Sequence, residues 1–376
     1  MICLKTKRFS WLIPILLLIA AALAVGLYFL LQNTDFSFLK QTQAAADPPS
    51  EAVIESLPPE ETEPPYVPDT FVISVIGDCT LSSSQYNSDY EDVLAKHDLA
   101  WPFSGTRDYF VQDEFTLANL ECSFSDTALT SSSLFAFRGP AANAAILSQG
   151  GVDCVTLGNN HTNDFGAQGL TDTQAALDAV GVEWVGPGDS RLYETEHGLK
   201  VGVYCPGWTG LSESNIQNGI AALQSAGADV CIFAPHWGNE GSYVVSDNQI
   251  AYAHIAVDAG AQIVCGTHPH VLQRIEEYNG GYIFYSLGNW SFGGNTAPRD
   301  RDTAIAQITV KLQKDGSYVI KGYEVIPCCL SSTDAINDYR PVPYEKGTAE
   351  YDRAITKLDG SFNGPDLTVD YSFINN

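Results

Sequence analysis

Short, uninterrupted apolar runs recur along the chain from residue 71 onward, and each has the length of a buried β-strand. The first two, residues 71–76 and 115–120, stop close to a carboxylate, at Asp78 and at Glu121 respectively. Predicted helices and strands alternate after these runs. This alternation indicates an α/β fold.

Three later segments share one design, in which a predicted helix and a glycine turn lead into an apolar strand that is followed by histidine. Glycine suits the end of each helix because it adopts the left-handed backbone conformation at little cost. We expect the ends of all five strands to lie at one edge of a sheet. The helices are residues 141–149, 214–225 and 247–258, the strands are 152–157, 230–233 and 262–265, and the histidines are His161, His236, His268 and His270.

Three further strands are predicted later in the chain, at residues 281–286, 303–311 and 318–326. Turns rather than helices join them. We therefore expect these strands to be antiparallel.

A different pattern marks the start of the sequence. Residues 9–34 carry no charge, and their densest apolar part, residues 11–31, would cross a bilayer as a helix of about 30 Å. Lys5, Lys7 and Arg8 precede this part, which places residues 1–10 in the cytoplasm and the rest of the chain outside. We predict a single-pass protein of the cell membrane with an extracellular domain. A signal peptide cleaved near Ala46 is the alternative.

The remaining chain divides by composition. Residues 32–69 are rich in proline, glutamate and alanine and cannot bury enough apolar surface to fold, so we predict a disordered stalk. A folded domain is expected at residues 70–330 and a C-terminal extension at residues 331–376.

The net charge narrows the possible binding partners, and the cysteine pattern bears on disulfide bonds and metal sites. The formal net charge of −26 at pH 7 argues against binding to nucleic acid and against docking on anionic lipid. The nine cysteines include no C-x-x-C pair. Four of them lie within apolar strands and are expected to be buried: Cys154, Cys205, Cys231 and Cys265.

Polar side chains suited to metal binding gather at the predicted strand ends. A mixed set of nitrogen and oxygen donors suits Mn, Fe or Zn and allows one or two ions, the arrangement used for phosphoester hydrolysis. Taken alone, the stretch around Asn160 can also be an Asx-rich turn that bonds only to itself. The other three histidines, His97, His197 and His254, are expected to have structural roles. The candidate residues are Asp78, Glu121, Asn160, His161, His236, His268 and His270.

Six motifs occur in order: Gly77-Asp78, Asn119-Leu120-Glu121, Gly158-Asn159-Asn160-His161 with Asp164, His236-Trp237-Gly238-Asn239-Glu240, His268-Pro269-His270-Val271-Leu272-Gln273 and Tyr285-Ser286-Leu287-Gly288-Asn289. Together they resemble the bacterial capsule-synthesis CapA family, also called the poly-γ-glutamate capsule protein family, over about residues 71–330. The resemblance implies a calcineurin-like metallophosphoesterase fold, a layered α/β/β/α sandwich, here preceded by one transmembrane helix.

The resemblance also implies two metal positions joined by the carboxylate of Glu121. The other ligands divide between them, with Asp78 and His270 at the first, and Asn160, His236 and His268 at the second. The family's phosphoesterase relatives usually carry Asp-x-His in the first motif, whereas this chain has Asp78-Cys79-Thr80. The first metal position is therefore expected to be weaker. Cys79 is a possible replacement ligand, although it should point to the opposite face of the strand from Asp78.

Catalytic and substrate-binding roles follow from the same resemblance. His161 would protonate the leaving group, and Asp164 would fix its tautomer. Arg138 is a candidate for binding an anionic group of the substrate, with a surface ion pair as the alternative. Glu240 and Asn289 are weaker candidates for substrate contacts.

Two functions remain open on the sequence. The first is a metal-dependent hydrolase of the phosphoesterase type that acts outside the cell in the synthesis of a capsule, of poly-γ-glutamate or of a related surface polymer. The second is a non-catalytic scaffold, or an export or anchoring subunit, that keeps the fold. Expected partners are the polymer or a phosphoester and other membrane subunits of a polymer-synthesis complex.

Overall fold

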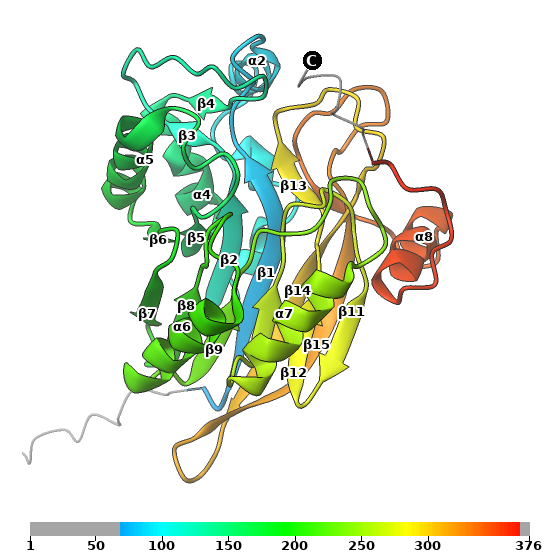
Figure 1. Cartoon of the computed structure of the whole chain (residues 1–376). Helices are drawn as coiled ribbons and strands as arrows, with labels where there is room; N and C mark the ends of the chain where they lie inside the picture. Colours follow the sequence, from blue (N-terminus) through cyan, green and yellow to red (C-terminus); the bar gives the residue numbers. More distant parts are fainter. Residues whose placement is uncertain (1–67, 369–376) are drawn as a thin grey trace, which may run out of the picture. The chain divides into compact units, whose positions relative to one another are not determined.

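The computed structural model describes residues 68–368 (Figure 1). The predicted membrane anchor at residues 11–31 lies outside the described residues, as do residues 32–67 of the predicted stalk. Within residues 68–368, no helix is both long enough and apolar enough to cross a bilayer.

Two large β-sheets form the centre of the domain (Figure 1). In the first sheet, β1 pairs in parallel with β2 and with β13, and β2, β5 and β6 continue the parallel part. On the other side of β1, the strands β14, β15 and β16 are antiparallel. The strand order is β16 (Val342–Pro343), β15 (Tyr318–Cys329), β14 (Asp302–Leu312), β1 (Thr70–Thr80), β2 (Phe115–Leu120), β5 (Cys154–Thr156) and β6 (Glu183–Val185), with β13 (Asn289–Phe292) also on β1.

The second sheet has parallel strands at its centre and one antiparallel strand at each edge. Its order is β11 (Ile275–Tyr278), β12 (Gly281–Phe284), β10 (Ile263–Cys265), β9 (Val230–Phe233), β8 (Lys200–Tyr204) and β7 (Ser190–Glu194). A separate pair of short strands, β3 (Ser123–Phe124) and β4 (Arg138–Gly139), lies apart from both sheets.

The helices α4 (Ala145–Gly150) and α5 (Gly166–Val180) pack on the outer face of the first sheet, and α6 (Glu213–Ser225) and α7 (Asp247–Asp258) pack on that of the second. Two short 3₁₀ helices, η2 (Trp101–Phe103) and η3 (Ala141–Ala144), lie with α4. The remaining helices are α2 (Asp89–Leu94), α3 (Arg107–Phe110) and α8 (Ala349–Leu358).

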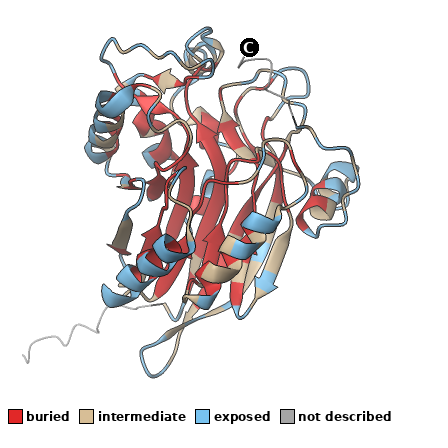
Figure 2. Ribbon diagram, in the orientation of Figure 1, coloured by how far each residue is buried: buried red, intermediate tan, exposed pale blue. Residues whose placement is uncertain are grey.

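Side-chain alternation explains why the two sheets stack. In β9, Ile232 points into the core between the sheets, whereas Cys231 and Phe233 point toward the helices. In β1, Ile73 and Val75 point into the same inter-sheet core. Because successive strand residues face opposite sides, strands that are apolar throughout must be covered on both faces. Figure 2 shows the central strands as buried, the strands at the sheet edges as partly exposed and the outer faces of the helices as exposed.

The arrangement is therefore an α/β fold in four layers, with helices outside two stacked sheets. The predicted strands are present, but the expectation of a single sheet edge is wrong. The strands that end near Asp78, Glu121 and Asn160 belong to the first sheet, and those that end near His236 and His268 belong to the second. The residues of the candidate site thus come from two sheets.

Several other local expectations need correction. The strand predicted at 281–286 is β12, which pairs antiparallel with β11 but parallel with β10. The helix predicted at 141–149 is two elements, η3 and α4. The pattern did not reveal α5, since most of the apolar residues of this helix are alanines and it includes glycine at positions 166 and 169.

Residues 331–368 add β16 and α8 to the domain, although the sequence suggested an extension. The Nζ atom of Lys357, on α8, lies 2.7 Å from one oxygen of Asp300 and 2.7 Å from one oxygen of Asp302. Arg353 donates two hydrogen bonds to Asp302, at 2.8 and 2.7 Å. These ion pairs tie α8 to the start of β14.

Candidate metal centre

The path of β1 determines where Asp78 lies. The ladder between β1 and β2 shifts register between Val75 and Asp78, and the backbone N–H of Asp78 donates to the carbonyl of Gly288 at 2.9 Å. A Cβ atom at Gly77 would lie 1.9 Å from the Gly288 carbonyl oxygen, so only glycine permits this approach. Asp78 is thereby placed, fully buried, between the two sheets' strand ends.

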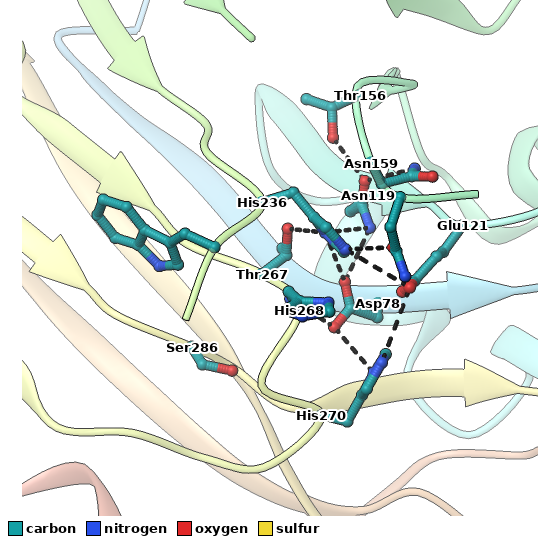
Figure 3. A network of polar contacts seen from close by, with 12 residues as sticks. Asp78, Asn119, Glu121, Thr156, Asn159, His236, Thr267, His268, His270 and Ser286 are labelled. Atoms are coloured by element: carbon teal, nitrogen blue, oxygen red, sulfur yellow. Dashed lines mark hydrogen bonds and ion pairs between the residues drawn. The ribbon is translucent and has the colours of Figure 1, made fainter. Parts of the chain in front are cut away.

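Three imidazoles converge on the buried carboxylate of Glu121, which follows β2. Its Oε1 atom lies 3.5 Å from Nε2 of His236, 3.7 Å from Nε2 of His270 and 3.8 Å from Nε2 of His161. Among the described residues, neither oxygen of Glu121 accepts a hydrogen bond. Burial raises the pKa of Glu121 well above its usual value. Figure 3 shows Glu121 facing His236 and His270.

His236 is held at the end of β9 by partners from both sheets. Its Nδ1 atom lies 2.9 Å from the hydroxyl of Thr267, and its Nε2 atom lies 2.8 Å from the amide oxygen of Asn160. Burial lowers the pKa of His236 well below its usual value. The ring is therefore neutral near pH 7, as a metal ligand must be.

His268 and His270 occupy an unusual backbone conformation after β10, with φ of 97° and 56°. Non-glycine residues in this region are strained, and such strain is concentrated at functional sites. The backbone N–H of His268 donates to Asp78 at 3.1 Å, while its ring Nδ1 is buried and has no partner among the described residues. Burial lowers the pKa of His268 to about 3, with a further contribution from His270.

His270 behaves in the opposite way. Burial by itself would lower its pKa, but the carboxylates of Glu121 and Asp78 outweigh that effect and raise the pKa to about 10. Its Nδ1 atom lies 3.3 Å from Asp78 and 2.8 Å from the amide oxygen of Asn289. The two buried carboxylates thus create a position that favours positive charge.

These residues fit a divalent metal. Metal–ligand distances of about 2.0–2.2 Å leave neighbouring ligand atoms roughly 3 to 4 Å apart, which is the spacing found around Glu121. Imidazole nitrogens with carboxylate oxygens are donors that Mn, Fe and Zn accept. A cation would also satisfy the orphaned oxygens of Glu121. Three groups of side chains are close enough to hold an ion: Glu121 with His236 and His268, Asp78 with Glu121 and His270, and Glu240 with His268 and His270.

The first motif differs from the phosphoesterase pattern in the way that the sequence suggested. Thr80, in the place of the usual histidine, donates its hydroxyl to the backbone carbonyl of Glu121 at 3.2 Å. Cys79 packs in the core between the first sheet and its helices, and burial raises its thiol pKa well above the usual value. The thiol of Cys79 therefore does not replace the missing ligand.

Asn119 is a site residue that the sequence analysis did not single out. Its amide nitrogen donates to Asp78 at 2.8 Å, and its amide oxygen accepts from Thr156 at 3.0 Å and from Asn159 at 3.2 Å (Figure 3). Such partners of metal ligands orient the ligand side chains. The sequence did hold a sign of this role, because Asn119 is a polar residue inside the otherwise largely apolar run 115–120.

His161 and Asp164 lie beside this cluster. Nδ1 of His161 lies 2.7 Å from an oxygen of Asp164, which leaves Nε2 facing Glu121. Both residues line a cavity of about 380 Å³ that also includes Asn160, Glu240, His270 and Asn289. The site is therefore open to a small molecule.

Arg138 is not among the residues that line this cavity. Its guanidinium donates to the carbonyl of Thr127 and lies 5.4 Å from the ring centre of Phe165. Arg299, which the sequence analysis did not select, lines the cavity instead.

The three remaining histidines have structural contacts away from the site. His197 pairs with Glu114 at 2.8 Å, and His97 stacks on Trp101. His254 contacts Glu276 at 2.9 Å. The eight described cysteines are free, and Cys154, Cys205, Cys231 and Cys265 are buried as expected.

Comparison with known proteins identifies similar sequences. The profile of the family described as "Bacterial capsule synthesis protein PGA_cap" matches residues 72–203 and 192–293. The capsule biosynthesis protein CapA of Bacillus anthracis is 30% identical over 210 residues, which cover 48% of this chain and 48% of that protein. The PGA biosynthesis protein CapA of Bacillus subtilis (strain 168) is 31% identical over 232 residues, which cover 54% of this chain and 56% of that protein. The matches thus span about half the length of these curated relatives.

Among solved structures, NAD nucleotidase (NadN) of Haemophilus influenzae aligns with a TM-score of 0.39 at 15% identity. The alignment covers 77% of this chain and 62% of the nucleotidase. This likeness is too distant to carry an argument about function.

Proposed function

The chain belongs to the bacterial capsule synthesis protein family, and on that premise we propose that it is a metal-dependent phosphoesterase that acts in the synthesis of a capsule or related surface polymer. The polymer class we propose is poly-γ-glutamate, from the sequence resemblance and from the Bacillus subtilis relative, which is named a PGA biosynthesis protein. We assign the domain to the calcineurin-like metallophosphoesterase fold.

One observation carries the proposal. Nε2 atoms of three histidines lie within 3.5–3.8 Å of one buried oxygen of Glu121, and that carboxylate has no hydrogen-bond donor among the described residues. An unpaired buried carboxylate is costly, so such a group is normally paired or coordinates a metal. A cation-binding role accounts for this arrangement better than packing does.

The ligands that would hold one or two divalent ions are Asp78, Glu121, Asn160, His236, His268 and His270. When bound, such ions supply an activated water and polarise a phosphoryl oxygen. The chain's own contribution is positional. Asn119 orients Asp78, and Asn289 orients His270.

Proton transfer would fall to His161. Because Asp164 accepts a hydrogen bond from Nδ1, a proton on Nε2 faces the cavity and is available to the leaving oxygen. His161 and Asp164 are thus the proposed catalytic pair, with Asp164 as the positioning residue.

The alternative is a scaffold or an export subunit without catalysis. Thr80 supports this alternative, because it occupies the first-motif position where phosphoesterases carry a metal-binding histidine. A site with one ligand fewer is expected to bind metal more weakly. Weaker metal binding would lower turnover without changing the fold.

The experiment that tests the hydrolase is metal analysis combined with a substrate panel. The full-length chain, loaded separately with Mn, Fe and Zn, is assayed on phosphomonoesters and phosphodiesters. Glu121→Gln is the matched control, since it keeps the shape of the side chain but removes its charge. We expect metal binding and turnover in the wild type and loss of both in the variant. Turnover that is no higher in the wild type than in Glu121→Gln would exclude the hydrolase and favour the non-catalytic scaffold.

We also propose that residues 11–31 anchor the protein and hold its domain outside the cell, beside other membrane subunits of a polymer-synthesis complex. The support is the uncharged run and the basic residues before it. A C-terminally tagged protein should remain in the membrane fraction and be removed from whole cells by external protease. Release of a soluble form trimmed near Ala46 would show a cleaved signal peptide instead.

A further inference from the structure

The cavity beside the metal centre places an arginine in a lining that also holds His161 and His270 from the centre itself, neutral polar side chains, carboxylates and phenyl rings. Arg299 is the only arginine or lysine among the described residues that line it. The lining also includes the carboxylates of Asp164, Glu240 and Asp300. In a chain with a formal net charge of −26, a cation at this place needs an explanation.

Arg299 is held by a backbone contact, and no ion pair within residues 68–368 neutralises it. Its guanidinium donates to the backbone carbonyl of Leu367, and no carboxylate of the described residues forms an ion pair with it. The neighbouring Asp300 is occupied, because it accepts hydrogen bonds from Lys357 at 2.7–2.8 Å and from the hydroxyl of Tyr243 at 2.8 Å. The positive charge of Arg299 is therefore available to a ligand.

Phenyl rings connect the metal centre to the outer part of the same cavity. The ring of Phe137 lies 5.0 Å from that of His161 and 5.8 Å from that of Phe292, which in turn lies 5.1 Å from His270. Phe135 also lines the cavity and exposes 48% of its surface. A group attached to the leaving oxygen beside His161 would meet these rings.

We propose that this cavity is a leaving-group subsite for a small anion with a flat or apolar body, whose second negative charge pairs with Arg299. The proposal rests on the proposed phosphoesterase function, because it takes the metal centre as the place of the phosphoryl group. Arginine suits this role because its planar donors bind a carboxylate or a phosphate in two-point fashion. The cavity volume of about 380 Å³ is in the range of small-molecule sites.

The test measures binding rather than turnover. Calorimetry with the full-length, Mn-loaded protein compares phenylphosphonate with 4-carboxyphenylphosphonate and with 1,4-phenylenediphosphonate. The last two probes carry the second charge as a carboxylate and as a phosphonate, so they separate the two kinds of anion. The variants are Arg299→Gln and Arg299→Lys, with Arg138→Gln as the control because Arg138 is an arginine outside the cavity.

In the wild type, we expect the second charge to increase affinity by about tenfold or more, as is usual for a charge-assisted contact. Arg299→Gln should abolish this gain and leave the affinity for phenylphosphonate unchanged, and Arg299→Lys should keep part of it. Arg138→Gln should behave like the wild type. Phe135→Ala should weaken binding of all three aryl probes but not of methylphosphonate, which has no ring.

Equal affinity for all three aryl probes in the wild type, or no binding of any of them, would overturn the subsite. So would an equal loss for all three in Arg299→Gln. These results are distinguishable from a failure of the proposed function. A protein that hydrolyses no phosphoester but keeps the Arg299-dependent preference has the subsite without the chemistry. A protein that hydrolyses phosphoesters with no contribution from Arg299 has the chemistry without the subsite.

Discussion

Nδ1 of His161 lies 2.7 Å from a carboxylate oxygen of Asp164, and this contact leaves Nε2 of His161 3.8 Å from Glu121. His161 is therefore oriented by one acidic residue toward another. The distance to Glu121 is similar to those of His236 and His270. Metal analysis of a His161 variant distinguishes a general acid from a metal ligand at this position.

If His161 is the general acid, His161→Asn should lower turnover by about 10²- to 10⁴-fold. Metal content and melting temperature should change little. The loss should be smallest for substrates with acidic leaving groups, since these need little protonation. Asp164→Asn should have a milder effect, because it removes only the orienting contact. Steady-state kinetics on a series of aryl phosphates measure the loss of turnover and its dependence on the leaving group in both variants. Loss of metal in His161→Asn would instead show that His161 is a metal ligand, in place of the histidine that is absent at position 80.

His236→Ala and His268→Ala should each lower metal affinity by more than the roughly 10- to 100-fold that is typical of residues around the ligands. The fold should survive, because the removed side chains lie at strand ends and not between the sheets. Equilibrium dialysis with metal analysis measures the affinity. His197→Ala is the control, since His197 pairs with Glu114 outside the candidate site. Full metal retention in both variants would exclude the proposed centre.

Lys357→Met should destabilise the domain by about 3–5 kcal/mol, because it removes the cation paired with the buried carboxylate of Asp300 and one of the two paired with Asp302. The Lys357 side chain is 2% exposed, so water cannot replace it. Arg353→Ala should cost less, since Arg353 is 42% exposed. Denaturant unfolding of both variants measures the difference. An equal loss of stability in the two variants would mean that burial of the ion pair does not determine how much it stabilises the domain.

The free energy of unfolding should depend on pH through Asp113 and Asp153, near the start of β2 and of β5. Burial raises the pKa of Asp113 to about 7 and that of Asp153 to about 6. Their usual pKa is about 3.9, so the folded state holds more protons than the unfolded state between these values. The stability they contribute is present at low pH and is lost as the pH rises through about 6 to 7.

Unfolding should therefore become easier between about pH 4 and about pH 7, and Asp113→Asn should reduce that slope because asparagine does not ionise. Asp315→Asn is the control. The pKa of Asp315 is lowered by its hydrogen bonds to Ser317, so this residue titrates below the range tested. Metal ligands also titrate, so only the difference between wild type and variant is informative. An unchanged slope in Asp113→Asn would contradict the assignment.

Much of the fold and of the candidate site could be predicted from local patterns. Strands such as β1 and β9 are apolar on both faces, which is a property of neighbouring residues and needs no knowledge of distant ones. Polar residues near the ends of these apolar runs, such as Asp78 and His236, therefore stood out. The six motifs likewise carried the family resemblance before any coordinates were considered.

Other features depend on contacts between residues far apart in the sequence. Arg138 and Arg299 are both arginines near polar or glycine-rich stretches, and only the packing shows that Arg299 lines the cavity while Arg138 lies over Phe165. The single sheet that we expected was wrong for a related reason. Periodicity shows that a strand is buried but not which strand covers it, so two sheets and one sheet have the same local signature.

The sequence by itself thus indicated the most apolar strands and the kinds of ligand at their ends, because backbone preference and side-chain chemistry are local properties, but it did not reveal strands such as β8 (Lys200–Tyr204) and β13 (Asn289–Phe292). Tertiary structure alone decided that Asp78, from one sheet, meets the backbone of His268, from the other, at 3.1 Å. It also decided the positive φ angles of His268 and His270, since such strained backbone persists only where surrounding packing maintains it. The metal centre joins the two sheets, and that junction is a product of their packing.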